Sequence, residues 1–259
     1  MKFQTIAQAL ACTTVALASS LVFAQTAAPR AVGPATQAAA ERAPVNFNGV
    51  WEMLDAKAVT RPGGPKAPYT EKYAKEMAHF TKHFDVNGVD DRIKLCDDRG
   101  MPWVMSSRAR TYPHEIYQNE DRMFMLFEGM DTERNVHIGQ TAFPTDDGAS
   151  VQGYSIGRWE GKTLVIETRK LMPRPMPDPF PRSAKARVIE RWTMETLPEV
   201  GDVINVEGVY EDPEVYTEPQ KLTQKWKRAQ PGVRVLSYNC PQALWDNHLA
   251  KRKKELGLP

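Results

Sequence analysis

The sequence predicts a mainly β protein whose strands form an up-and-down antiparallel β-barrel. From Tyr112 onward, short segments rich in β-branched and aromatic residues alternate with turns. Glu160-Gly161 separates the segment YSIGRW from TLVIET, a pattern typical of a β-hairpin. Eight or more strands joined by short links favour a closed barrel, because closure removes exposed strand edges. A β-sandwich is the alternative.

Strand boundaries follow from the apolar runs and the turns between them. We expect the first strand in residues 45–51. The turn Asn119-Glu120-Asp121 and the break from Pro198 to Asp202 separate two of the later pairs. The other strands are predicted near residues 112–119, 121–128, 133–139, 151–159, 162–169, 186–195, 203–211, 220–228 and 233–239.

Two helices are predicted, one before and one after the main run of strands. The N-terminal helix spans Tyr69 to Phe84, with Thr70 as its N-cap. Its apolar side chains form a stripe that should lie on the sheet or close a barrel end: Tyr73, Met77, Phe80 and Phe84. The C-terminal helix covers Pro241 to Leu256 and should pack on the barrel through Leu244, Trp245 and Leu249.

The first 24 residues have the pattern of a bacterial signal peptide. Lys2 provides the positive start, an apolar stretch runs from Ile6 to Phe23, and Ala24 stands at the cleavage position. A transmembrane anchor is the alternative, but the apolar stretch is short and interrupted by Gln, Thr and Ser. We therefore expect cleavage after Ala24, export to the periplasm and no stable membrane span afterwards.

The mature chain is predicted to contain one folded domain. Residues 25–44 should form a disordered linker because they hold few large apolar groups to bury. Residues 45–250 form the barrel domain, and residues 251–259 form a basic tail. The full chain has 34 Lys and Arg against 32 Asp and Glu, a net charge of +2. This balance argues against a nucleic-acid partner, which needs a dominant basic surface.

Two cysteines remain after removal of the signal peptide, Cys96 and Cys240. An even number of cysteines in an exported protein indicates a disulfide, because the periplasm is oxidising. We predict a Cys96–Cys240 bond that joins the segment before the sheet to the segment after it. Such a bond would stabilise the fold by roughly 4 kcal/mol. Two buried free thiols are the alternative.

Two parts of the sequence resemble known proteins. Gly49-Val50-Trp51 resembles the Gly-x-Trp start of lipocalins, in which the Trp plugs one barrel end. The motifs CDDRGMP, YPHEIYQ, MLFE, SIGRWEGKTLVIET, DPEVYTEP and LSYNC are similar to an uncharacterised family of exported bacterial proteins. Members usually carry Asp-Gly-Arg before the SIG motif and Gly-Phe after the strand. This chain has Ile138-Gly139-Gln140 and Arg169-Lys170 instead, so any site built on those residues is altered here.

Three residues are candidates for acid–base chemistry. Glu190 falls on an otherwise apolar strand face, since alternate side chains share a face. Such a carboxylate either pairs with an arginine, here Arg134 or Arg158, or has a raised pKa and a function. His114 is the histidine best suited to proton transfer because its ordinary pKa is near neutrality. Tyr154 is the candidate for stabilising developing charge. A structural role is the alternative for each.

Residues near these three are candidates for binding a ligand. Either face of residues 112–118 can point inward, so candidates come from both faces. Prolines occupy every second position from 173 to 181, which predicts a stiff surface crossing or, alternatively, a lid. The candidates are Glu115, Tyr117, His137, Arg158, Glu167, Trp192 and Gln224, with Met176 and Phe180 on the Pro-rich segment.

Other motif-like patterns lack the context that their chemistry requires. Gly153-Tyr154-Ser155-Ile156-Gly157 matches a nucleophile elbow, but a strand follows where the elbow needs a helix. His79 and His83 stand four apart without the acid of a zincin motif, so we expect a solvated helix face. The sequence has no Rossmann glycine pattern, P-loop or Cys/His cluster, and we expect neither a cofactor nor a metal.

The leading functional hypothesis is a periplasmic barrel that binds a small apolar or aromatic molecule in its interior. The alternative is a cofactor-independent lyase, isomerase or hydrolase that uses His114 or Glu190 as a base. A structural protein of the cell envelope with a filled core is the third. Convergence of His114, Glu190 and Tyr154 favours the enzyme, whereas an apolar cavity with one or two polar anchors favours the binding protein.

Overall fold

The computed structural model describes most of the chain after residue 42. The described residues are 43–55, 60, 63, 66–85, 89–90, 94–106, 112–145, 148–174, 181–241 and 243–258. They belong to one compact unit, Gly33–Pro259. The predicted signal peptide and nearly all of the predicted linker lie outside them, so both remain predictions.

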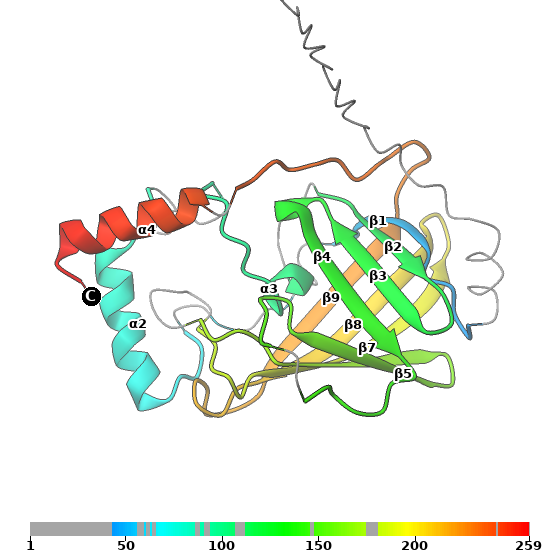
Figure 1. Ribbon diagram of the computed structural model, residues 1–259. Coiled ribbons are helices and arrows are strands. Elements are labelled where there is room, and N and C mark those ends of the chain that lie inside the picture. The colour runs from blue at the N-terminus through cyan, green and yellow to red at the C-terminus, as the bar shows by residue number, and fades with distance from the viewer. Residues whose placement is uncertain are drawn as a thin grey trace, which may run out of the picture. The chain divides into compact units, whose positions relative to one another are not determined.

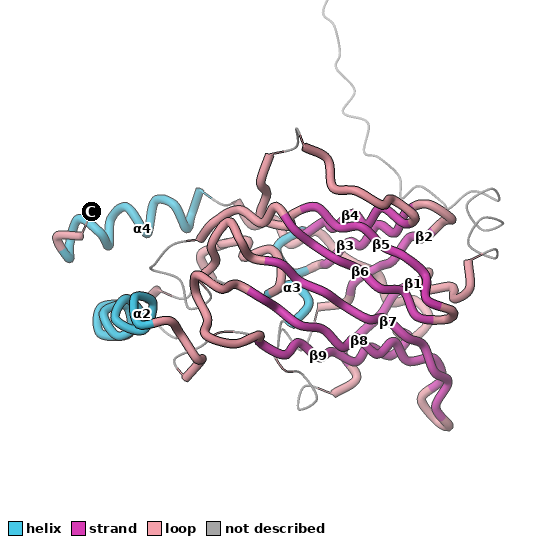
Figure 2. Tube along the Cα trace, turned by 90° about the horizontal axis from the view of Figure 1, so that it is seen from below, coloured by secondary structure: helices cyan, strands magenta, loops and turns pink. Residues whose placement is uncertain are grey.

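Within the described residues, nine strands form a closed barrel in sequence order (Figures 1 and 2). This confirms the predicted fold class. The strands are β1 Gly49–Met53, β2 His114–Gln118, β3 Arg122–Phe127, β4 Thr132–Ile138, β5 Tyr154–Glu160, β6 Thr163–Arg169, β7 Arg187–Leu197, β8 Gly201–Glu211 and β9 Gln220–Arg228.

One strand pair in the barrel is parallel. Neighbouring strands are antiparallel all round the barrel, including the closing pair β1 and β9, except for β4 and β5. A ring must contain an even number of direction reversals, so nine strands cannot all be antiparallel to both neighbours. The long link over residues 139–153 returns the chain to the end where β4 began, and β5 then runs parallel to β4.

The predicted strand over residues 233–239 does not form. No strand edge is left for it to pair with at this point, because β9 pairs directly with β1. The segment is extended, and side-chain carboxylates bind its backbone in place of a neighbouring strand. The amide of Leu236 donates to Glu128, and those of Tyr238 and Asn239 donate to Asp131.

The Gly-x-Trp sequence at the start of β1 has a packing explanation. Gly49 has a φ of +125°, and a Cβ on it would lie 2.6 Å from Nη1 of Arg228. The Arg228 guanidinium lies 4.4 Å from the ring centroid of the buried Trp51 and donates to the carbonyl of Asn48. A side chain at position 49 would displace this arginine from the β1–β9 junction.

The main helices are α2 Glu71–His83 and α4 Ala243–Leu256, with the short α3 Trp103–Ser106 and the 3-10 turn η1 Gly129–Asp131 between them. Helix α2 corresponds to the helix predicted over 69–84, and it lies between the first strand and the main run of strands, as predicted. Thr70 does not cap it, because its hydroxyl donates to the carbonyl of Glu214. None of the described helices is both long and apolar enough to span a bilayer.

The apolar stripe of α2 packs mainly against the C-terminal region and not against the sheet. Only Tyr73 joins the barrel core. Met77, Phe80 and Phe84 form a separate cluster, against which Leu249, Leu256 and Leu258 pack. On α4, Trp245 is buried as expected, whereas Leu244 is exposed.

A buried carboxylate joins α4 to the chain after α2. Asp90 accepts hydrogen bonds from Arg252 and from the amide of Asp85, at 2.9 and 2.8 Å, and contacts Nε2 of His248 at 2.7 Å. Arg252 also donates to the carbonyl of His83. The residues expected to form a basic tail from 251 onward are therefore part of α4 as far as Leu256.

The predicted disulfide is present. Cys96 and Cys240 are bonded, with their Cα atoms 5.1 Å apart and a sequence separation of 144. The bond joins the segment that carries α3 to the extended segment after β9. Both segments also contribute to the site described next.

Candidate functional site

Packed side chains fill the middle of the barrel. Met123, Met125, Leu164, Ile166 and Trp192 are buried there with less than 2 % exposure. We expected a hollow interior, and this part of the expectation is wrong. Aromatic rings continue the packing: the ring centroid of Trp192 lies 5.1 Å from that of Trp226 and 5.9 Å from that of Phe47.

A buried ion pair lies inside this packed region. Arg134 on β4 donates from Nη1 to Oε1 of Glu190 at 3.1 Å and from Nη2 to Oε2, and both side chains have 0 % exposure. Nη2 of Arg134 also donates to the Thr168 hydroxyl at 3.0 Å, and the Ser155 hydroxyl lies 2.8 Å from that of Thr168. Both carboxylate oxygens of Glu190 are therefore occupied, which makes it a poor general base.

Arg134 is one of the two partners that the sequence suggested for Glu190. The other, Arg158, is exposed and pairs with Glu160 at 2.9 Å. Ser155, the serine of the elbow-like motif, lies on β5 inside the cluster, where its hydroxyl is directed to Arg134 and Thr168. Its surroundings are those of a core hydroxyl and not those of a nucleophile.

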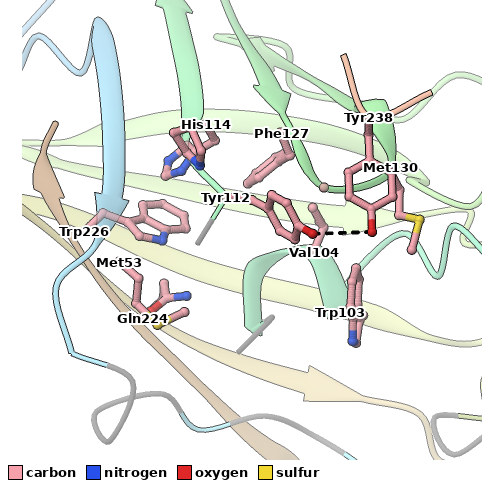
Figure 3. A pocket seen from close by; sticks show the side chains of 12 residues that line it. Met53, Trp103, Val104, Tyr112, His114, Phe127, Met130, Gln224, Trp226 and Tyr238 are labelled. Carbon is pink, nitrogen blue, oxygen red and sulfur yellow. Dashed lines mark hydrogen bonds between the residues drawn. The ribbon is translucent and has the colours of Figure 1, made fainter. Parts of the chain in front are cut away.

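Free space lies in a pocket toward one end of the barrel, with a volume of about 50 Å³ (Figure 3). Strands β1, β2, β3 and β9 form its floor, and α3, η1 and the segment after β9 complete its wall. The lining residues are Met53, Trp103, Val104, Tyr112, Pro113, His114, Phe127, Gly129, Met130, Gln224, Trp226 and Tyr238.

His114 is the central polar residue of this pocket. Its imidazole stacks on Phe127, with centroids 5.1 Å apart, and lies 4.3 Å from Trp226. The side chain is buried, and Nε2 has no hydrogen-bond partner among the described residues. Burial alone lowers the pKa of His114 to about 3, because a charged imidazole would lose its hydration without gaining a counter-charge. His114 is thus neutral at physiological pH.

Three further polar groups reach the pocket. Gln224 projects from β9 beside Met53 (Figure 3), and its Oε1 accepts from the amide of Lys225 at 3.0 Å. At the rim, the hydroxyls of Tyr112 and Tyr238 lie 3.5 Å apart, and their rings meet edge to face at 5.2 Å. The backbone amide of Tyr238 donates to the Asp131 carboxylate at 2.7 Å, which anchors the backbone that carries the Tyr238 ring.

The three predicted acid–base residues are not brought together. Tyr154 lies on the outer side of the barrel wall, where it stacks on His137 at 4.5 Å and donates to Gln140 at 2.7 Å. Glu190 is paired within the core, and His114 is in the end pocket. No contact among the described residues links any two of the three.

Of the predicted ligand-binding residues, only Gln224 lines the pocket, beside the predicted acid–base candidate His114. Trp192 belongs to the packed core, and Met176 and Phe180 lie outside the described residues. The others alternate with inward-facing neighbours and therefore lie on the outer face of the wall: Glu115, Tyr117, His137, Arg158 and Glu167. Burial together with Glu115 raises the pKa of Tyr117 to about 12.

Most residues of the aromatic wall were not among the predicted site residues. Trp226 could have been found, because it is two residues from Gln224 and so shares its strand face. Trp103 and Tyr238 come from segments outside the strands, and their positions depend on long-range packing that no local pattern reports.

Nothing in the described residues groups three or more His, Cys, Asp or Glu side chains around a possible metal position. His79 and His83 are neighbours on α2, with ring centroids 4.4 Å apart. Comparison with models of protein families finds no match to this chain, and comparison with curated proteins finds none either.

Proposed function

We propose that this protein binds one small apolar or aromatic molecule in the end pocket. The wall supports this function, because Trp103, Phe127 and Trp226 present aromatic surface around His114 and Gln224 (Figure 3). Small-molecule sites typically combine an apolar lining with a few placed polar groups. Burial of apolar ligand surface against such a wall supplies the binding free energy, at about 25 cal/mol per Å².

The size of the pocket limits the ligand. A water molecule occupies about 30 Å³ of liquid, and a cavity holds one when roughly 10–15 Å³ is open to its centre. The 50 Å³ here has room for a few water molecules, so we propose a ligand no larger than a single ring, admitted when wall residues move. Tyr112, which is 36 % exposed at the rim, is the side chain best placed to move.

A binding role is favoured over the enzyme alternative. The only titratable imidazole of the pocket is neutral and a weak base, since burial lowers its pKa to about 3. Glu190 is held by Arg134, and Tyr154 is outside the wall. The disulfide supports the proposed export to an oxidising compartment such as the periplasm.

Filling the pocket tests this function. Val104→Phe adds a ring at α3 where the pocket has about 50 Å³ to accept it. We expect toluene and phenol to raise the thermal midpoint of the wild-type protein in a concentration-dependent way. The Val104→Phe variant should lose this response. Mass spectrometry of small molecules that co-purify with the exported protein would identify the natural ligand.

Val209→Phe is the matched control, because Val209 is 37 % exposed on β8 and does not line the pocket. It carries the same substitution and should keep the wild-type response. If neither compound shifts the midpoint of the wild-type protein, or if Val104→Phe responds as wild type does, the pocket is not the binding site.

A further inference from the structure

We infer that the ligand is an uncharged, single-ring aromatic molecule with one hydroxyl or carbonyl group that hydrogen-bonds to His114. This inference rests on the proposed function and specifies the ligand class of the same pocket. Phenols and aromatic aldehydes are members of this class. Benzoates, aromatic amines in their charged form and plain hydrocarbons are not.

The lining excludes charged ligands. None of the twelve residues described in the wall is an acid, a lysine or an arginine, and the single histidine is neutral. A carboxylate or an ammonium group would lose hydration in the pocket and find no counter-charge among these twelve residues. A neutral ligand has no such cost.

The imidazole of His114 is the reason to expect one polar group on the ligand. It is enclosed by Phe127 and Trp226, whose rings offer it no hydrogen bond in the positions that they occupy. Buried polar side chains are nearly always hydrogen-bonded, and each exception needs a reason. A ligand that pairs with Nε2 removes the cost of leaving this atom without a partner.

The neutral state of the ring admits two kinds of partner. A neutral imidazole has one N–H donor and one acceptor nitrogen, so it can receive a hydroxyl proton or donate to a carbonyl oxygen. Gln224 stands on the same side of the pocket with its Oε1 already bonded to Lys225 (Figure 3). The Nε2 of this amide is a donor, which also favours an oxygen on the ligand.

The inference is tested with two ligands of nearly equal shape, phenol and toluene, and a substitution that keeps a flat ring, His114→Phe. Dissociation constants for each ligand are measured by ligand-observed NMR on the purified full chain, for wild type and variant. We expect His114→Phe to shift the ratio of phenol to toluene affinity toward toluene by roughly 2- to 10-fold, the effect of one net hydrogen bond. Benzoate should not compete with toluene at neutral pH.

His137→Phe is the matched control, since His137 also stacks on an aromatic ring but lies on the outer wall. It should leave the ratio unchanged. The inference is overturned if the phenol-to-toluene affinity ratio does not change in His114→Phe, or if benzoate competes as well as phenol. In either case, toluene binding would still support the pocket as the binding site. Failure of both phenol and toluene to bind the wild-type protein overturns the proposed function itself.

Discussion

Replacing Glu190 by Gln should destabilise the barrel more than any single change of charge on its surface. Gln is close in shape to Glu but neutral, so the substitution leaves the Arg134 guanidinium charged, fully buried and without a counter-ion. Thr168 and Ser155 offer only hydroxyl dipoles to it. The charge cannot reach water, because neither side chain has any exposed surface.

Breaking a buried ion pair by removing one partner typically costs about 3–5 kcal/mol. In a domain of this size each kcal/mol lowers the thermal midpoint by about 2–4 °C, so we expect a drop of roughly 6–20 °C. The double variant Arg134→Met with Glu190→Met should recover most of the loss, because a buried pair can often be replaced by apolar residues of similar volume. The Ser155 and Thr168 hydroxyls, 2.8 Å apart, still pair with each other.

Urea unfolding followed by tryptophan fluorescence measures these differences, provided that the denaturant slope stays constant. Glu160→Gln is the matched control, because Glu160 is 40 % exposed and its pairs with Arg158 and Arg191 lie in solvent. It should cost less than about 1 kcal/mol. If Glu190→Gln costs no more than Glu160→Gln, or if the double variant is less stable than Glu190→Gln, the account of the core is wrong.

Two further predictions concern stability. His114 has a folded pKa of about 3 against 6.5 in the unfolded chain, so only the unfolded state gains this proton as the pH falls below 6.5. The free energy of unfolding should therefore be greatest above pH 6.5 and fall by about 2 kcal/mol by pH 5. Urea unfolding of His114→Phe at both pH values should show a decrease that is smaller by this amount. Equal losses in wild type and variant would contradict it. Replacing both Cys96 and Cys240 by Ser opens a loop of 144 residues and should cost up to about 5 kcal/mol. An unchanged calorimetric midpoint for this double variant would show that the bond does not stabilise the fold.

The fold could be predicted because its determinants are local and periodic. The turn at Gly161 and the alternation in 154–169 define a hairpin from a short window of sequence. The predicted strand over 233–239 failed for a non-local reason. Its alternating pattern is compatible with a strand, but β1 already occupies the free edge of β9, and carboxylates of the β3–β4 turn bind its backbone instead.

The candidate site was predictable only where it lies on strands. His114 and Gln224 were identified as polar residues on strand faces, and the pleat places both inward. The face of residues 114–118 could not be assigned in advance, because buried His114, Ile116 and Gln118 alternate with residues that also include an aromatic, Tyr117. The alternation of residues shows which side chains share a strand face. Only the closed barrel determines which of the two faces points inward.

The position of the pocket follows from how the barrel fills its interior. The ion pair of Arg134 and Glu190 makes the middle of the barrel both full and charged, so an apolar guest there would have to displace packed side chains and disturb the pair. At the end of the barrel the strands contribute only a floor, including His114. The rest of the wall includes η1 and two segments, those of Trp103 and Tyr238, that the Cys96–Cys240 bond joins. A site assembled in this way needs both the closed barrel and the disulfide, and reduction should therefore weaken ligand binding before it unfolds the strands.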